Sequence, residues 1–280
     1  SIRGLHVASD VESEVASDVD AIEGALSFRA LLAGRIQFNR LLIRNARLTV
    51  SQASEGAPWR IGGLLLEAPP ASGTVSEKNS STPAIVGLRG LQIADSRVRL
   101  VLPHGTLDLA IRSAQLDSLL PWMVQGPTRF DISATANGAT MSLKGTARPF
   151  AAVPSLSAEV TVEGLPAATL GLVVDVGNVA PQGSLALAGK LVASVGDGPL
   201  QARWDGTIRG AALSLRLPGL LEPIRAKSAI WTGALSTAKG GTVTGRLGAR
   251  ALSFTPAGGP PVTASSVQFD GLRNSAPGTL

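Results

Sequence analysis

The chain has 280 residues, of which 44% are hydrophobic and 16% are charged, and it contains no Cys and no Tyr. This composition excludes disulfides, thiolate nucleophiles and cysteine metal sites, while the length suffices for one large domain or two smaller ones. The formal net charge of +5 is uneven, because residues 1–23 carry −5 and the remaining 257 residues carry +10. A basic balance favours an anionic partner, either nucleic acid or anionic lipid headgroups.

No apolar run approaches the ~20 residues that a helix needs to cross a bilayer. The N-terminus also lacks the charged and apolar regions of a signal peptide. We expect the chain to be an excerpt of a longer protein, with any export signal or membrane anchor outside it.

The N-terminal part is acidic, with five carboxylates in residues 10–20. A calcium-binding EF-hand loop needs Gly at its sixth position and Glu at its twelfth, but Val15 and Ala21 stand there. The cluster therefore favours the solvated face of a strand over a calcium site.

Three short stretches depart from a strand pattern. Residues 28–34 predict a helical turn that ends at Gly34, as expected for a glycine C-cap. Residues 116–124 are a possible second helix, and residues 71–84 form a polar loop of low complexity.

The main pattern is strict alternation of apolar and polar residues. In 156–163, Leu156, Ala158, Val160 and Val162 alternate with polar residues. Successive side chains of a strand point to opposite faces, so each such run predicts a strand with one apolar and one polar face. The same alternation occurs in 106–112, 129–135, 140–147, 184–191, 200–209, 212–217 and 242–248.

Turn residues separate these runs, notably Asn137-Gly138, 196–198, 239–241 and 258–261. Asn-Gly and Asp-Gly favour tight hairpins because both positions accept positive φ. Antiparallel sheets tolerate one wet face, whereas parallel sheets are usually covered on both. The chain therefore predicts a meander of antiparallel hairpins.

A weak repeat is present, since residues 42–50 resemble residues 92–100 at an offset of 50. Residues 251–254 followed by 267–269 are a poorer third copy. The repeat units lie near 19–70, 85–118 and 226–272. Repetition of this kind predicts a structure that grows along one axis.

A Leu-Leu-x-Gly turn at 31–34 follows a strand-like segment and leads into Arg35-Ile36-Gln37-Phe38 and then Arg47-Leu48-Thr49-Val50. Trp59 follows a Gly-containing loop, and residues 164–166 have the sequence Gly-Leu-Pro. These features resemble the AsmA/TamB superfamily of bacterial envelope proteins.

The resemblance implies a long, groove-shaped β-sheet with an apolar interior, in a protein that bridges the periplasm. It implies a role in phospholipid movement to the outer membrane and in outer-membrane homeostasis. It also implies an inner-membrane anchor, which would lie outside this chain, and it carries over no catalytic residues.

We therefore predict an all-β fold, with one elongated, mostly antiparallel twisted sheet over 1–280 that forms a hydrophobic groove, and one or two short helices. A sheet face lined by Leu, Val and Ala would solvate acyl chains, with a gain of about 0.8 kcal/mol per buried CH₂. The predicted lipid-facing residues are Leu107, Leu109, Ile111, Phe130, Ile132, Leu156, Val160, Val162, Leu185, Leu187, Leu200, Trp204 and Ile208.

Alternatives to a lipid conduit remain open from the sequence. The chain could be an assembly factor that offers edge strands to outer-membrane or secreted proteins by β-augmentation. It could also be a structural β-solenoid, and a closed β-sandwich core would show the same alternation.

No enzyme or cofactor chemistry is predicted. His6 and His104 have no partner in a metal motif, and there is no nucleophile elbow or phosphate-binding loop. Nucleic-acid binding would need aromatic stacking partners among the basic residues, and aromatic residues make up only 4% of the chain. We therefore expect a protein that is not an enzyme, with no metal, cofactor or nucleic acid, whose partners are phospholipid acyl chains, membranes at one or both ends and other envelope proteins.

Overall fold

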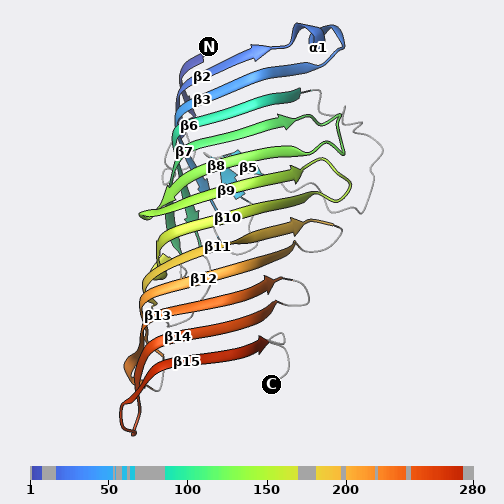
Figure 1. The fold of residues 1–280 in the computed structure, drawn as a ribbon. Coiled ribbons are helices and arrows are strands. Elements are labelled where there is room, and N and C mark those ends of the chain that lie inside the picture. The colour runs from blue at the N-terminus through green and yellow to red at the C-terminus, as the bar shows by residue number, and fades with distance from the viewer. Residues whose placement is uncertain are drawn as a thin grey trace. The chain divides into compact units, whose positions relative to one another are not determined.

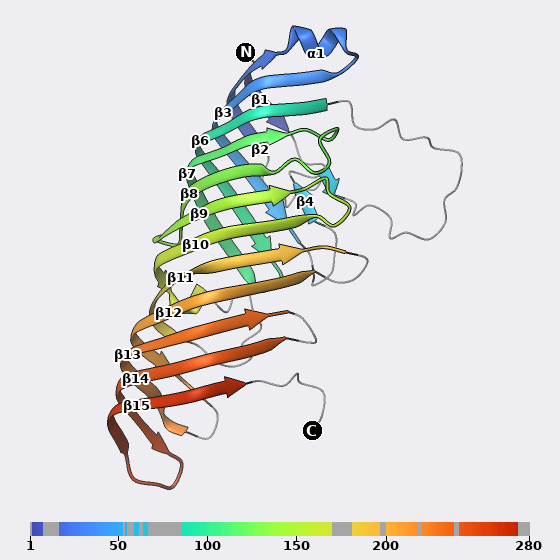
Figure 2. The same cartoon turned by 45° about the vertical axis from the view of Figure 1, so that its right-hand side comes forward.

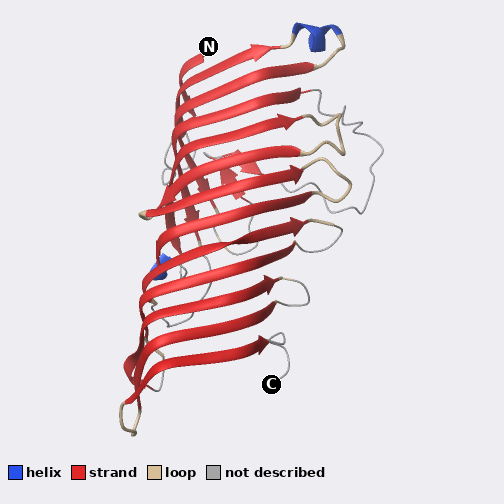
Figure 3. Cartoon of the chain, in the orientation of Figure 1, coloured by secondary structure: helices blue, strands red, loops and turns tan. Residues whose placement is uncertain are grey.

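The computed structural model describes residues 2–7, 17–52, 54, 59–61, 64–66, 86–169, 181–196, 200–217, 220–237 and 241–273. Nearly all regular structure in these residues is β-strand. Helix is confined to α1 (Phe28–Leu32) and to one 3-10 turn, η1 (Ala167–Thr169), as Figure 3 shows. The prediction of an all-β chain with one or two short helices is confirmed.

Thirteen strands follow one another in the hydrogen-bonded order β1-β2-β3-β6-β7-β8-β9-β10-β11-β12-β13-β14-β15, and Figure 1 labels most of them. Outside this order, β4 pairs with β3 and β5 pairs with β4. In the described part of the chain β1 and β15 do not pair with each other, so the sheet is not closed. The strands are β1 (Ile2–Val7), β2 (Ser17–Leu26), β3 (Ile36–Ser51), β4 (Trp59–Ile61), β5 (Leu64–Leu66), β6 (Val86–Leu102), β7 (Gly105–Leu119), β8 (Thr128–Ala136), β9 (Ala139–Arg148), β10 (Ser155–Pro166), β11 (Gln182–Ser194), β12 (Gln201–Leu215), β13 (Leu220–Ser236), β14 (Thr242–Pro256) and β15 (Val262–Arg273).

The chain divides into two compact units. Unit 1 comprises residues 1–135, 143–156 and 195–199, and unit 2 comprises the remainder. Unit 1 contains α1, strands β1 to β7 and nearly all of β8. Unit 2 contains most of β10 and the whole of β11 to β15.

In unit 1, β3 and β6 form a parallel pair whose register equals the sequence repeat. Ile36 pairs with Val86, Leu42 with Gln92 and Val50 with Leu100, each at an offset of 50. The weak repeat seen in the sequence is therefore two strands that lie side by side, with each residue next to its own copy.

Several long strands contain one non-glycine residue in the left-handed region. In the parallel pair these residues are Asn45 (φ 51°) and Asp95 (φ 49°), again at an offset of 50. Asn and Asp adopt this conformation more readily than other residues with a Cβ. In unit 2 the corresponding left-handed residues are Ala212 on β12 (φ 50°) and Ala251 on β14 (φ 51°).

After the left-handed residue, the apolar side chains shift from even to odd sequence positions. On β12, the apolar side chains before Ala212 include Trp204 and Ile208, at even positions, whereas Leu213 and Leu215 after it are at odd positions. A local bend of this kind re-aims the following side chains. It explains why 200–209 and 212–217, predicted as separate strands, form one strand with a bend.

Some local predictions are confirmed and one is wrong. Asn137 (φ 48°) and Gly138 (φ 85°) form the tight turn between β8 and β9, with the positive φ values of a type I′ turn. Residues 116–124 are not a helix, because β7 continues to Leu119 and the chain then turns. The predicted loop at 71–84 lies outside the described residues.

Candidate functional site

In unit 1 the apolar face consists of rows of side chains that cross β3, β6 and β7. Leu48 on β3, Val98 on β6 and Leu109 on β7 are successive cross-strand partners. Directly paired residues lie on the same face of a sheet, where their side chains can contact each other. The row on one side is Val50, Leu100 and Leu107, and on the other side Ser96 pairs with Ile111.

A buried serine supports this face beside the left-handed residues. Ser96 is only 2% exposed. Its Oγ accepts a hydrogen bond from the backbone N–H of Ala46 at 3.1 Å and donates one to the carbonyl oxygen of Ala94 at 2.9 Å. Buried backbone amides almost always have a partner, and here the side chain of the neighbouring strand supplies it.

In unit 2 one row of apolar residues crosses five consecutive strands. Leu187 pairs with Ile208, Ile208 with Trp231, Trp231 with Leu247 and Leu247 with Phe269. A parallel row runs through Leu191, Trp204, Leu235 and Val243. Two rows of large apolar side chains therefore lie on the same face.

Between these two rows lies a row of four glycines, hereafter the glycine row. It consists of Gly189 on β11, Gly206 on β12, Gly233 on β13 and Gly245 on β14, each paired with the next. No side chain rises from the sheet along this line. The face therefore has space directly above the backbone of four adjacent strands.

Two indole rings lie over the glycine row. The rings of Trp204 and Trp231 are stacked, with centroids 5.7 Å apart and planes at 17°. A Cβ on Gly189 would lie 2.7 Å from Trp204 Nε1, and a Cβ on Gly233 would lie 2.8 Å from Trp231 Cζ2. Only residues without a side chain leave room for the two stacked rings.

The sequence analysis did not identify the glycine row or Trp231. The pattern that could have revealed them is apolar-x-Gly-x-apolar, which recurs in four consecutive strands. Its copies are Leu187 to Leu191, Trp204 to Ile208, Trp231 to Leu235 and Val243 to Leu247.

The large side chains of the apolar faces are only partly buried. Of the fourteen buried hydrophobic residues in the described part of the chain, nine are Ala, and no large side chain there is fully buried. In a closed core the large aliphatic side chains would be among the most buried. The arrangement instead leaves rows of half-buried Leu, Val and Ile side chains, typical of a surface that takes up apolar groups.

The predicted lipid-facing residues divide into three groups. Val162 and Leu185 are buried, at 5% and 9% exposed, whereas Leu200 is 55% exposed and precedes β12. The half-buried residues in unit 1 are Leu107, Leu109, Ile111, Phe130, Ile132 and Leu156, and those in unit 2 are Val160, Leu187, Trp204 and Ile208.

The polar faces carry exposed ion pairs. Arg203 and Asp205 on β12 form a two-point contact, with Nε–Oδ2 at 2.7 Å and Nη2–Oδ1 at 2.8 Å. This hydrogen bond with Arg203 lowers the pKa of the Asp205 carboxyl. In unit 1, Arg99 on β6 holds Asp108 on β7 at 2.8 Å, and this contact raises the pKa of Arg99.

The described residues contain no group of three or more side chains able to hold a metal ion. His104 is exposed in the turn between β6 and β7, and the side chain of His6 lies outside the described residues. Within the described segments, no helix has the length and apolar character required to cross a bilayer.

Comparison of the chain with models of protein families, with curated proteins and with solved structures finds no match. The candidate site therefore depends on the chain's own geometry: two sheet faces with in-register rows of half-buried apolar side chains.

Proposed function

We propose that the apolar sheet faces hold the acyl chains of lipids, and that the chain is a hydrophobic conduit or scaffold for phospholipid movement in the bacterial envelope. The observation that carries the proposal is the large share of Leu, Val and Ile side chains that stay half-buried on in-register rows. Each CH₂ of an acyl chain that leaves water for such a surface gains about 0.8 kcal/mol.

The proposed setting is the periplasm, with inner-membrane anchoring by a segment outside this chain. The resemblance of residues 19–50 to the AsmA/TamB superfamily supports this setting. We include in the proposal that the sheet forms a groove like that of the superfamily. We also include membranes as partners at one or both ends.

The experiment is lipid extraction from the purified chain, followed by mass spectrometry. We expect co-purified phospholipid with the wild-type sequence. Leu187→Asp and Val160→Asp each place a carboxylate on an apolar face and should reduce the bound lipid several-fold, because burial of an unpaired charge is unfavourable.

Each variant has a matched control on the next residue of the same strand. Ala188→Asp and Thr161→Asp place the same carboxylate at exposed positions of the opposite face, so bound lipid should stay at the wild-type level. Circular dichroism checks that all four variants remain folded. A folded wild-type chain without lipid would contradict the proposal.

A second candidate function follows from the sheet edge. In the described part of the chain β15 pairs with β14 and with no other strand, and an unpaired edge can accept a strand from another protein. An assembly role by β-augmentation is therefore the alternative. It predicts binding of extended peptides that is insensitive to Leu187→Asp.

A further inference from the structure

The strand ends around α1 form a rim in unit 1, hereafter the α1 rim. It comprises the β2–β3 connection (26–36), the first residues of β6 and the β7–β8 connection (120–127). Figure 2 shows α1 at the tip between β2 and β3. In the parallel pair, Ile36 at the start of β3 lies beside Val86 at the start of β6.

Large apolar side chains are exposed along this rim. Phe28 and Leu32 on α1 are 74% and 77% exposed, and α1 buries none of its residues. The other exposed large hydrophobic residues of the rim are Leu26, Leu31, Ile36, Val86, Met123 and Val124. By contrast, the β6–β7 turn at the far end of the same strands contains Pro103 and His104.

The tip has defined structure, so this exposure does not come from an irregular loop. Ser27 caps α1 by accepting a hydrogen bond from the N–H of Ala30 at 3.3 Å. The N–H of Arg35 donates to the carbonyl oxygen of Ala30 at 2.9 Å, and Gly34 closes the turn at φ 69°. The backbone thus holds the Phe and Leu side chains outward.

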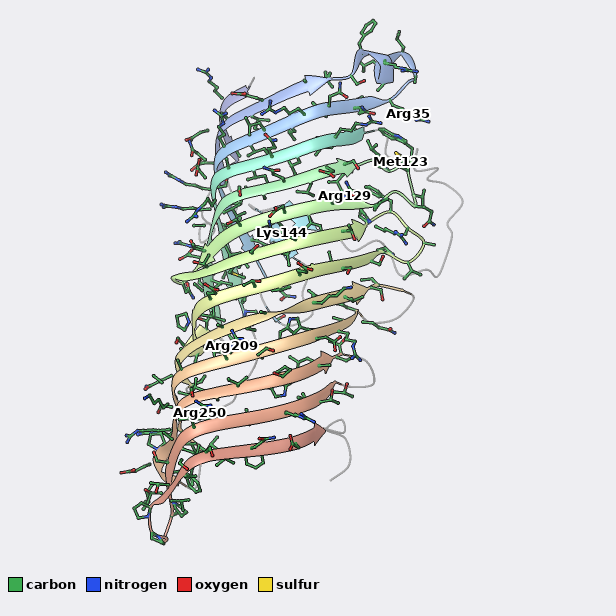
Figure 4. The ribbon with its side chains drawn as sticks, viewed as in Figure 1. Arg35, Met123, Arg129, Lys144, Arg209 and Arg250 are labelled. Atoms are coloured by element: carbon green, nitrogen blue, oxygen red, sulfur yellow. The ribbon has the colours of Figure 1, made fainter. Side chains whose placement is uncertain are left out.

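A cation–π contact joins the two connections of the rim. The guanidinium of Arg35 lies 5.1 Å from the centre of the Trp122 ring. The ring in turn covers Gly87, where a Cβ would lie 2.7 Å from Trp122 Cζ3. Arg35 and Met123 both lie at these strand ends in Figure 4.

The charge on the rim has one sign. Residues 26–36, 86–89 and 120–127 contain three Arg and no Asp or Glu. In the described residues Arg29 and Arg35 form no ion pair. The exposed apolar groups therefore lie together with two guanidiniums that have no carboxylate partner among the described residues.

We propose that the α1 rim docks on the surface of an anionic phospholipid bilayer. Phe and Leu side chains favour the boundary between headgroups and acyl chains. Arg side chains extend their guanidiniums to the phosphates, and Trp favours the same interface. The choice of a bilayer as partner rests on the proposed function, since a phospholipid conduit must meet a membrane.

The test is flotation of the chain with vesicles of phosphatidylethanolamine and phosphatidylglycerol, compared with vesicles of phosphatidylcholine. We expect binding to the anionic vesicles that weakens as salt rises, because salt screens exposed charges. The double variant Phe28→Ser/Leu32→Ser should lose at least tenfold in binding. Arg29→Gln/Arg35→Gln should reduce binding to anionic vesicles and leave the phosphatidylcholine level unchanged.

Leu221→Ser is the matched control, because Leu221 on β13 is 68% exposed and lies outside the rim. It removes one exposed Leu and should leave vesicle binding at the wild-type level. Absence of binding to anionic vesicles, or equal losses in the control and the rim variant, would overturn the inference. Self-association that Phe28→Ser/Leu32→Ser abolishes in the absence of vesicles would overturn it in favour of a protein interface.

The lipid extraction above separates this inference from the proposed function. Phe28 and Leu32 lie on the rim and not on a sheet face, so their variant should keep wild-type levels of co-purified lipid. Vesicle binding without co-purified lipid would support membrane docking by the α1 rim and reject lipid binding by the sheet faces. Co-purified lipid without vesicle binding would support lipid binding by the faces and reject membrane docking by the rim.

Discussion

In both units, residues of the same type lie next to each other on neighbouring strands. The two units achieve this by different kinds of strand pairing. In unit 1, β3 and β6 run parallel at an offset of 50, so Asn45 lies at the same height as Asp95. In unit 2, β11 to β14 are antiparallel, and the glycine row aligns Gly206 with Gly233. Both arrangements produce continuous rows of similar side chains.

The difference shows which sequence pattern each pairing needs. A parallel pair preserves direction, so any repeated segment can stack on its copy. An antiparallel pair reverses direction, so only a pattern that is the same in both directions can stack on itself. Apolar-x-Gly-x-apolar is symmetric about its glycine, and therefore both glycine and apolar residues meet their counterparts.

The largest effect is expected from filling the glycine row. A Cβ on Gly233 would collide with the carbonyl oxygen of Thr244 and lie 2.8 Å from the Trp231 ring. We expect Gly233→Ala to lower the free energy of unfolding by about 3 kcal/mol, since overpacking and backbone shifts cost this much. Urea denaturation measures the change.

The control for this variant is Gly248→Ala on β14, in the same unit. A Cβ on Gly248 meets only the carbonyl oxygen of Ile230, at 4.0 Å. The free energy of unfolding should change by less than about 0.5 kcal/mol. Equal losses at both glycines would show that the Trp rings do not depend on the glycine row.

The next largest effect concerns the parallel pair. Ser96→Ala removes the acceptor of the buried Ala46 N–H, and an unsatisfied buried amide costs about 1–3 kcal/mol. We expect a loss of about 2 kcal/mol by urea denaturation. Ser265→Ala, at an exposed position of β15, should be nearly neutral, and a neutral Ser96→Ala would mean that water replaces the hydroxyl.

A smaller, stabilising effect is expected at the left-handed alanines. Ala212→Gly and Ala251→Gly relieve a conformation that is unfavourable for a residue with a Cβ, and each should raise the free energy of unfolding by about 0.5–1 kcal/mol. Asn at either position, as at Asn45, should raise it by less. Ala211→Gly, next to Ala212 but without positive φ, should lower the stability, and a gain there would contradict the assignment.

The smallest effect is expected from the exposed pair Arg203–Asp205. The folded state lowers the pKa of Asp205, so the pair stabilises the fold above the unfolded-state pKa of Asp and loses this contribution as the pH falls through the folded-state value. Asp205→Asn should therefore lower the urea midpoint relative to the wild type slightly more at pH 7 than at pH 3. Because the pair is solvent-exposed, 0.5 M salt should remove most of the difference.

Local features were predictable where neighbouring residues decide them. The alternating runs gave the strands because a half-buried sheet face imposes period two, and Asn137-Gly138 gave its turn because both residues accept positive φ. Residues 116–124 were misjudged because their apolar run is compatible with a helix or a strand. Pairing of β7 with β6, where Leu116 lies opposite Leu91, resolves that ambiguity.

The strands at the alternating runs, the turn at 137–138, the helical turn at 28–32 and the repeat at an offset of 50 follow from the amino-acid order, because each depends on local conformation or on pattern alone. The parallel pairing of the repeat, the alignment of four glycines under Trp204 and Trp231, and the contact between Arg35 and Trp122 arise only in the folded chain. These features depend on strand register, and register is a relation between segments that no single segment encodes.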